Sequence, residues 1–472
     1  MSPEKRIQQR LERLQEHLKR EAPVLVGVVD RFRHLDKIAK KMGLMKNGES
    51  FATQISWWPM ISILGTFSAG KSSFINSYVE RPLQKTGNQA IDDRFTVISY
   101  SHDNEDKVLP GLALDGDPRF PFYRISKEID KVAKGEGAKI DSYLQMKVIS
   151  NEILKGKILI DSPGFDADEQ RKATLRITDH IISLSDLVMV FFDGRHPEPG
   201  AMQDTLNHLV KNTQKRSDSG KFIFILNQID TSAKEDNLEE IVAAWQKALV
   251  QSGMNTGRFY VLYNKELAVP VEDKNVWARY EQKRDHDYAE ITARMNGIGT
   301  ERIYRIVGSM ESLANQIEHQ TVPQLKAALQ KWKKQVLWVD LVTFSTLFVA
   351  FMITSVLAGY WHGLSFNPPW FATAQENPVF SLSIMGGVVL LLMGFHFYMR
   401  SVFSKVIAKT LSSDSSGDVK AAFIKSTRFF RSIFQRNPKG WGRGTQKKLT
   451  ALRDDTDRFV QKINDSFTQP SG

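Results

Sequence analysis

The feature that most constrains this chain is a glycine-rich segment, residues 65–72, of the form G-x-x-x-x-G-K-S. It follows the apolar run 60–64 as a loop follows a buried strand. Such a loop turns backbone N–H groups toward phosphate oxygens, Lys71 brings a positive charge, and the Ser72 hydroxyl is a ligand that Mg²⁺ accepts. The segment therefore predicts a nucleoside triphosphate site that includes Gly65, Ser68, Ala69, Gly70, Lys71, Ser72 and Ser73.

Two further apolar runs end in residues suited to the same site. Residues 157–160 lead into Asp161, in the pattern D-x-P-G that ends at Gly164. There a carboxylate can hold Mg²⁺ through water, and the Gly164 N–H can meet the γ-phosphate. Residues 222–226 lead into N-x-x-D, formed by Asn227, Gln228 and Asp230. A carboxylate at Asp230 can accept both N–H donors of a guanine edge, so the pattern predicts guanine selection.

In residues 55–270 these motifs resemble the G domain of the dynamin superfamily. Within it the chain is similar to bacterial dynamin-like proteins and to EH-domain-containing (EHD) ATPases. The resemblance implies hydrolysis of GTP with Mg²⁺, and dimerisation of G domains across the nucleotide. The residues that carry it are Ser68-Ala69 before Gly-Lys-Ser, Asp92-Asp93-Arg94-Phe95, Asp115 to Phe122, the D-x-P-G motif, Phe191-Phe192-Asp193 and Asn227.

The resemblance also implies roles for single residues. Ser68 would help organise the transition state together with Lys71, because Phe165 stands where small GTPases keep a water-orienting glutamine. Thr96, favoured over Thr86, would be the switch threonine, a catalytic group that ligates Mg²⁺ with Ser72 and Asp161.

One departure leaves the base open. Gln228 replaces the lysine that the family usually stacks beneath the base. The EHD relatives use ATP despite an N-K-x-D motif, so ATP stays an alternative to GTP.

Two long uncharged stretches lie downstream. Residues 341–361 contain no charged side chain, and residues 379–399 contain only the ionisable His396. Each can cross a hydrocarbon core, which needs about 20 helical residues. The alternative is a pair of core helices in a soluble domain. A stripe of small residues predicts close packing of the two segments as a hairpin, or dimerisation with another chain: Thr346, Ala350, Thr354 and Ala358.

The distribution of charge predicts the topology. From Arg400 to the end there are fifteen Lys/Arg and six Asp/Glu, so most of the formal +11 lies after the second stretch. The loop 361–378 has no Lys or Arg. The positive-inside rule then predicts a two-pass integral membrane protein with both termini cytoplasmic. We expect its location to be the bacterial inner membrane. We expect the basic tail to bind anionic lipids rather than nucleic acid. With no cysteine, the chain has no disulfide or thiol chemistry.

The predicted fold class is an α/β P-loop G domain, with a mixed, mostly parallel sheet and helices on both faces, plus an α-helical stalk and a two-helix transmembrane hairpin. The expected parts are an N-terminal helical segment (1–54), the G domain (55–280), a helical stalk (281–335), the hairpin (336–400, helices about 338–360 and 379–399) and a basic helical tail (401–472). Apolar stripes on the flanking helices predict a bundle or a coiled coil.

The predicted function is that of a membrane-anchored dynamin-like GTPase whose hydrolysis is coupled to self-association and to membrane remodelling or tethering. Two alternatives stay open. One is an EHD-like ATPase, and the other is a membrane-bound nucleotide switch that recruits partners without acting as a motor.

Overall fold

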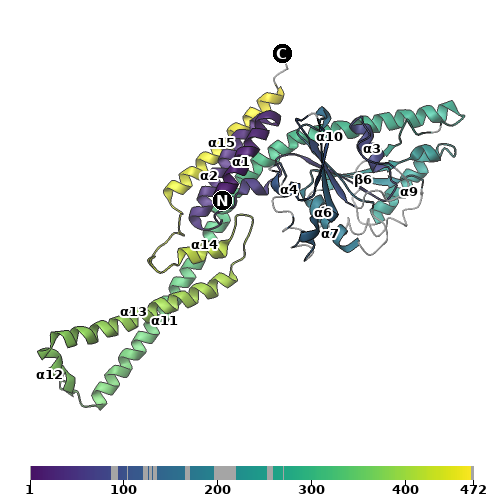
Figure 1. The fold of residues 1–472 in the computed structure, drawn as a ribbon. Helices are drawn as coiled ribbons and strands as arrows, with labels where there is room; N and C mark the ends of the chain where they lie inside the picture. The colour runs from purple at the N-terminus through teal and green to yellow at the C-terminus, as the bar shows by residue number, and fades with distance from the viewer. Residues whose placement is uncertain are drawn as a thin grey trace. The chain divides into compact units, whose positions relative to one another are not determined.

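The computed structural model describes residues 2–86, 94–103, 105–117, 119–120, 126, 130, 135–164, 171–195, 219–251, 259–268 and 270–468. The chain forms two compact units. One consists of Gln8–Val29 and Ala52–Ile306, and the other of Met1–Ile7, Asp30–Phe51 and Val307–Gly472. Each is described by itself (Figure 1).

An eight-stranded mixed sheet forms the centre of the first unit, in the order β3-β4-β2-β5-β1-β6-β7-β8. Strands β5, β1, β6, β7 and β8 run parallel to one another, whereas β2 is antiparallel to β5 and β3 is antiparallel to β4. The strands are β1 (Met60–Gly65), β2 (Phe95–Tyr100), β3 (Lys107–Pro110), β4 (Leu144–Ile149), β5 (Ile158–Asp161), β6 (Leu187–Asp193), β7 (Phe222–Asn227) and β8 (Phe259–Leu262).

Helices cover both faces of this sheet, because its central strands are apolar on both sides. In β6, Val188, Val190 and Phe192 pack toward Trp245 of α9 (Leu238–Gln251). The intervening Met189 and Phe191 pack on the opposite face, in a cluster with side chains of α3 (Lys71–Tyr78) and α10 (Lys274–Gln316). The predicted α/β class with a mixed, mostly parallel sheet is confirmed. Other described α-helices in this unit are α1 (Pro3–Glu21), α4 (Ala113–Gly116), α6 (Ile140–Tyr143) and α7 (Arg171–Leu184).

The second unit is helical. A π-helical turn, Ile317–Thr321, joins α10 to α11 (Val322–Leu357). Around it lie α2 (Val26–Met42), α14 (Val419–Ser426) and α15 (Arg443–Thr468). Three polar contacts connect these elements: Arg31 Nε lies 3.1 Å from Asp455 Oδ2, Lys425 Nζ donates to the Lys40 carbonyl at 2.7 Å, and Arg453 pairs with Glu318.

Helices α11 and α13 (Pro378–Thr410) are the two long apolar helices of this unit. The apolar stretches of both helices are almost entirely exposed, so neither is packed as a core helix. Between them lie β9 (Trp361–His362), β10 (Ser365–Phe366) and α12 (Pro369–Glu376). Helix α11 ends three residues before the predicted position, because Gly359 adopts φ +70° and Tyr360 N–H donates back to the Ser355 carbonyl.

Helices α11 and α13 cross part-way along their lengths and diverge toward α12 (Figure 1). The contact joins His396 Nδ1 to Asp340 Oδ2 at 2.6 Å and brings the rings of Phe344 and Phe395 to 6.1 Å. The small-residue stripe does not form this contact, since all four of its members are exposed: Thr346, Ala350, Thr354 and Ala358.

Candidate nucleotide site

The motif residues of the first unit gather at one edge of the sheet. Strands β5, β1, β6 and β7 are adjacent and parallel, so their carboxyl ends lie together. Asp161 is in register with Ile63 of β1, and Asp193 with Asn227 of β7. Open α/β sheets bind ligands at this edge.

The loop between β1 and α3 needs its glycines for close packing. A side chain at Gly65 would place Cβ 2.5 Å from the Phe191 carbonyl oxygen. Gly70 has φ +83°, and a Cβ there would lie 2.1 Å from Asn227 Nδ2. Ser68 also adopts a left-handed conformation, with φ +56°. The loop is therefore a tight turn that leads into the first residue of α3, Lys71.

Lys71 is only 7% exposed, and its Nζ donates to the carbonyls of Gly65 at 3.1 Å and Thr66 at 2.8 Å. Burial lowers the pKa of this amine to about 8, although the Asp161 carboxylate acts in the opposite direction. A desolvated cation beside a turn of backbone is well placed to meet a phosphate.

Asp161 has a polar neighbour that no sequence motif indicates. Gln84 Nε2 donates to Asp161 Oδ2 at 2.6 Å, while the Gln84 side-chain oxygen accepts from Lys147. Gln84 is 5% exposed, so it joins two charged groups inside the protein. It lies in the loop after α3, and nothing in its local sequence distinguishes it from other loop residues.

Thr96 is in register with Asp161 across β2 and β5, and is 1% exposed. Its hydroxyl accepts a hydrogen bond from Gln145 Nε2 at 2.8 Å. Thr86, the alternative switch threonine, is exposed. Carboxylate and hydroxyl oxygens at one edge are the hard ligands that Mg²⁺ requires, so the chemistry of Asp161 and Ser72 fits that ion.

The N-x-x-D segment is bonded to the phosphate loop. Asn227 Nδ2 donates to the Ala69 carbonyl at 2.9 Å, and Gln228 Nε2 donates to the Ser68 carbonyl at 2.5 Å. Gln228, which stands in place of the expected lysine, therefore binds the phosphate loop through its side-chain amide. Its φ of +65° starts the short turn that contains Asp230.

Asp230 is half-buried, and this burial raises the pKa of its carboxyl, with Arg195 acting in the opposite direction. The Arg195 guanidinium is bound to Asp193, with Nη2 to Oδ2 at 2.7 Å and Nε to Oδ1 at 3.0 Å. Arg195 is a second neighbour of the site that the motifs do not indicate.

The D-x-P-G motif packs against the same loop, since a Cβ at Gly164 would lie 2.9 Å from Phe67 Cα. Ser72 and Ser73 lie in the first turn of α3, partly exposed. Lys71, Asn227, Gln228 and Gly164 thus come together around one loop. Thr96 lies beside Asp161, and Asp230 lies in the turn after β7. Phe165, Asp92 and Asp93 lie outside the described residues.

A glycine-dependent turn between β1 and α3, with motif residues at the ends of neighbouring strands, is the arrangement of a P-loop G domain. Residues 61–229 match the dynamin family, and this match confirms the predicted resemblance of that segment to a dynamin-type G domain.

Curated relatives agree over a similar length. EH domain-containing protein 1 from Homo sapiens is 24% identical over 179 residues, which cover 36% of this chain and 31% of the relative. EH domain-containing protein 3 from Mus musculus gives the same values. The chain therefore matches about a third of the length of these relatives.

Two solved structures show weaker likeness. One is described as an oligomerised bacterial dynamin pair that provides a mechanism for the long range sensing and tethering of membranes. It is 16% identical, with 99% of this chain and 76% of that chain covered and a TM-score of 0.33. The other is Toc33 from Arabidopsis thaliana, 12% identical, with 60% and 93% covered and a TM-score of 0.29. At these TM-scores neither carries a conclusion about this chain.

Proposed function

We propose that this protein is a membrane-anchored dynamin-like GTPase. The observation that carries the proposal is the convergence of Lys71, Asp161 and Asn227 on one glycine-dependent turn within a dynamin-type G domain. Water attacks the γ-phosphorus in line, and the bond from phosphorus to the β–γ bridging oxygen breaks.

Lys71 and the loop amides stabilise the charge that develops on the phosphate oxygens. Ser68 orients the reacting groups, and Asp230 accepts the guanine N–H donors. Mg²⁺, when bound, supplies further charge neutralisation. Ser72, Thr96 and Asp161 would hold it directly or through water. The Thr96 hydroxyl accepts one hydrogen bond from Gln145 and keeps a second lone pair for the metal.

We further propose that α11 and α13 anchor the protein in a bilayer as a two-pass hairpin with both termini cytoplasmic. Their exposed apolar surfaces support this, because a contiguous apolar surface of that size is rare in water. In this proposal, G-domain dimerisation and the helical stalk, residues 1–54, 281–335 and 401–472, couple hydrolysis to membrane remodelling or tethering. The bacterial inner membrane is the proposed location.

Hydrolysis by the full chain tests this function. GTP and ATP are compared in detergent and in liposomes over a range of protein concentration, with Lys71→Ala as the blank. GTP turnover per molecule that rises with concentration supports the assembly-driven GTPase. Turnover that is independent of concentration supports a nucleotide switch instead, and preference for ATP refutes guanine selection.

An adenine nucleotide stays the second candidate for one specific reason. Gln228 is neutral, so it does not offer the long cationic side chain that the family stacks beneath guanine. Its side-chain amide also donates to the Ser68 carbonyl. The same competition between GTP and ATP decides between the two substrates.

A further inference from the structure

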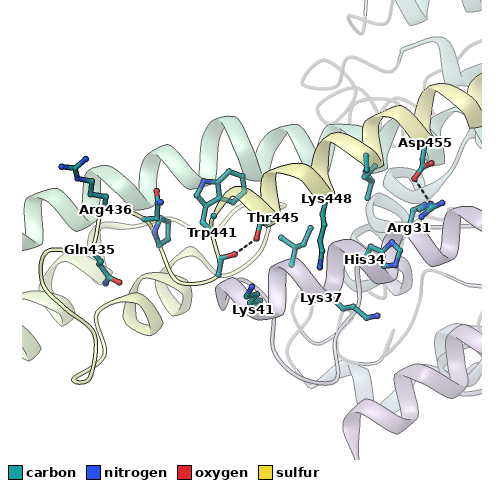
Figure 2. A pocket seen from close by; sticks show the side chains of 18 of the residues that line it. Arg31, His34, Lys37, Lys41, Gln435, Arg436, Trp441, Thr445, Lys448 and Asp455 are labelled. Carbon is teal, nitrogen blue, oxygen red and sulfur yellow. Dashed lines mark hydrogen bonds and ion pairs between the residues drawn. The ribbon is translucent and has the colours of Figure 1, made fainter.

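A cavity of about 880 Å³ lies in the helical unit, separate from the nucleotide site. Its walls come from α2, from the segment 431–442 and from the first half of α15. Figure 2 shows Lys448 of α15 extending toward α2, and His34 and Lys37 on α2 itself. The volume is within the range of about 300–1,000 Å³ that small-molecule sites occupy.

The lining is strongly basic. Among the described residues around the cavity, Asp455 is the one carboxylate, and Arg31 is already paired with it. Burial and the charges of Arg31, Lys37 and Lys448 lower the pKa of His34, with Asp30 opposing them. The cationic residues of the lining are Arg31, Lys37, Lys41, Arg431, Arg436 and Lys448.

One of these cations has an unused donor. The Arg431 Nη1 atom is buried and has no hydrogen-bond partner among the described residues. A buried donor without a partner is unfavourable, so an anion that accepted from Nη1 would be favoured. Gly444 and Thr445, in the first turn of α15, also line the cavity, and the start of a helix favours negative charge.

The segment that carries Arg431 contacts α13 where the uncharged stretch of that helix ends. Arg400 Nη2 donates to the Arg431 carbonyl, and the rings of Phe397 and Phe429 stack with centroids 4.0 Å apart. Phe429, Phe430 and Phe434 are 56%, 95% and 65% exposed. Exposed aromatic rings beside the end of an uncharged helical stretch suit the interface between hydrocarbon and head groups.

We propose that this cavity binds the phosphate head group of an anionic phospholipid. The proposal rests on the membrane anchoring proposed above and names a specific site for it. Phe429, Phe430 and Phe434 would enter the interface, which brings the adjoining cavity to the depth of the phosphates. Arg431 Nη1, Lys37, Lys41 and Lys448 then supply donors and positive charge to the phosphate oxygens.

The test is lipid binding by the full chain in a neutral detergent, followed by native mass spectrometry. The probes are dioctanoyl phosphatidic acid, dioctanoyl phosphatidylcholine and inorganic pyrophosphate. The pocket variant Lys37→Gln/Lys41→Gln/Lys448→Gln is compared with a control of equal charge, Lys46→Gln/Lys447→Gln/Lys462→Gln. All six lysines are exposed, and the three control lysines do not line the cavity.

We expect the wild-type chain to retain phosphatidic acid in preference to phosphatidylcholine. The pocket variant should weaken phosphatidic acid binding about tenfold or more, and the control variant less than about twofold. Equal weakening in both variants overturns the proposal, because it shows attraction to the whole basic surface. Pyrophosphate that displaces the lipid at the same concentration also overturns it and points to a soluble phosphate.

GTP hydrolysis measured on the same samples separates this proposal from the function above. Intact hydrolysis with no preference for phosphatidic acid refutes the head-group site alone. The opposite combination is a wild-type chain that prefers phosphatidic acid, a pocket variant that loses this preference, and samples that do not hydrolyse GTP. That result supports the head-group site and refutes the GTPase.

Discussion

Replacement of Lys71 by methionine should stabilise the protein when no nucleotide is present. Burial lowers the pKa of Lys71 from its ordinary value of 10.5 to about 8. Since one pKa unit corresponds to about 1.4 kcal/mol, keeping this amine charged in the folded state costs about 3 kcal/mol at neutral pH. Methionine removes the charge and keeps a side chain of similar length.

The gain in stability is reduced because the ammonium group of Lys71 makes two hydrogen bonds that methionine cannot make. The carbonyls of Gly65 and Thr66 lose a donor in the variant, at about 1 kcal/mol each. The net stabilisation is then about 1 kcal/mol, which for a domain of 150–250 residues raises Tm by about 2–4 °C.

Thermal unfolding of the full chain in detergent with a chelator measures this difference at pH 7. The exposed Lys234→Met, in the same domain, is the control for a change of charge alone. The pH dependence gives an independent check. Because the pKa of Lys71 is lower in the folded state, the unfolded state binds more protons between about pH 8 and 10.5. Wild-type stability therefore gains a rising contribution across that interval, and Lys71→Met lacks it.

Two results would refute this reasoning. One is a Tm for Lys71→Met that falls several degrees below that of the wild type without nucleotide. The other is the same slope of stability against pH in both proteins. Addition of GTP with Mg²⁺ should raise the Tm of the wild type and leave that of the variant unchanged.

Asp230→Asn should weaken GTP binding about tenfold or more in calorimetry, because a charge-assisted hydrogen bond is lost. Burial raises the pKa of Asp230, so the wild-type affinity for GTP should begin to fall at a higher pH than the ordinary pKa of an aspartate predicts. The same pH profile in wild type and variant contradicts this role. Gln84→Leu should tighten Mg²⁺ binding in the presence of GTP by about two- to tenfold, because it removes the hydrogen bond that competes with Mg²⁺ for the Asp161 carboxylate. The same Mg²⁺ titration in wild type and variant refutes this competition. Asp340→Ala and His396→Ala should each lower thermal stability in detergent, with a coupling of about 1 kcal/mol in the double-mutant cycle, and additive losses would show that the contact contributes nothing.

Much of the nucleotide site could be predicted because its chemistry follows from local sequence. A loop of the form G-x-x-x-x-G-K-S after an apolar run specifies both the turn and the strand before it. Asp161 and Asn227 each follow an apolar strand, and parallel strands bring their carboxyl ends to one edge. The motif roles of these residues stay predictions until nucleotide binding is measured.

Gln84 and Arg195 could not be found in this way. Each belongs to the site through a contact across the fold, with Gln84 bonded to Asp161 and Arg195 held near Asp230 by Asp193. A glutamine or an arginine in a loop has no periodicity or spacing that distinguishes it from its neighbours.

The apolar helices likewise combine features that the sequence determines with contacts that only the fold determines. Their length and lack of charge are properties of consecutive residues, so the sequence by itself determined that two helices suited to a bilayer are present. It placed Asp340 and His396 as isolated ionisable residues, and the fold alone decided that they meet at 2.6 Å. The basic residues of α2 and α15 are likewise separated by about 400 positions along the chain, and only tertiary packing brings them around one cavity. Local patterns encode secondary structure and motif chemistry, whereas contacts between distant residues depend on how the elements pack.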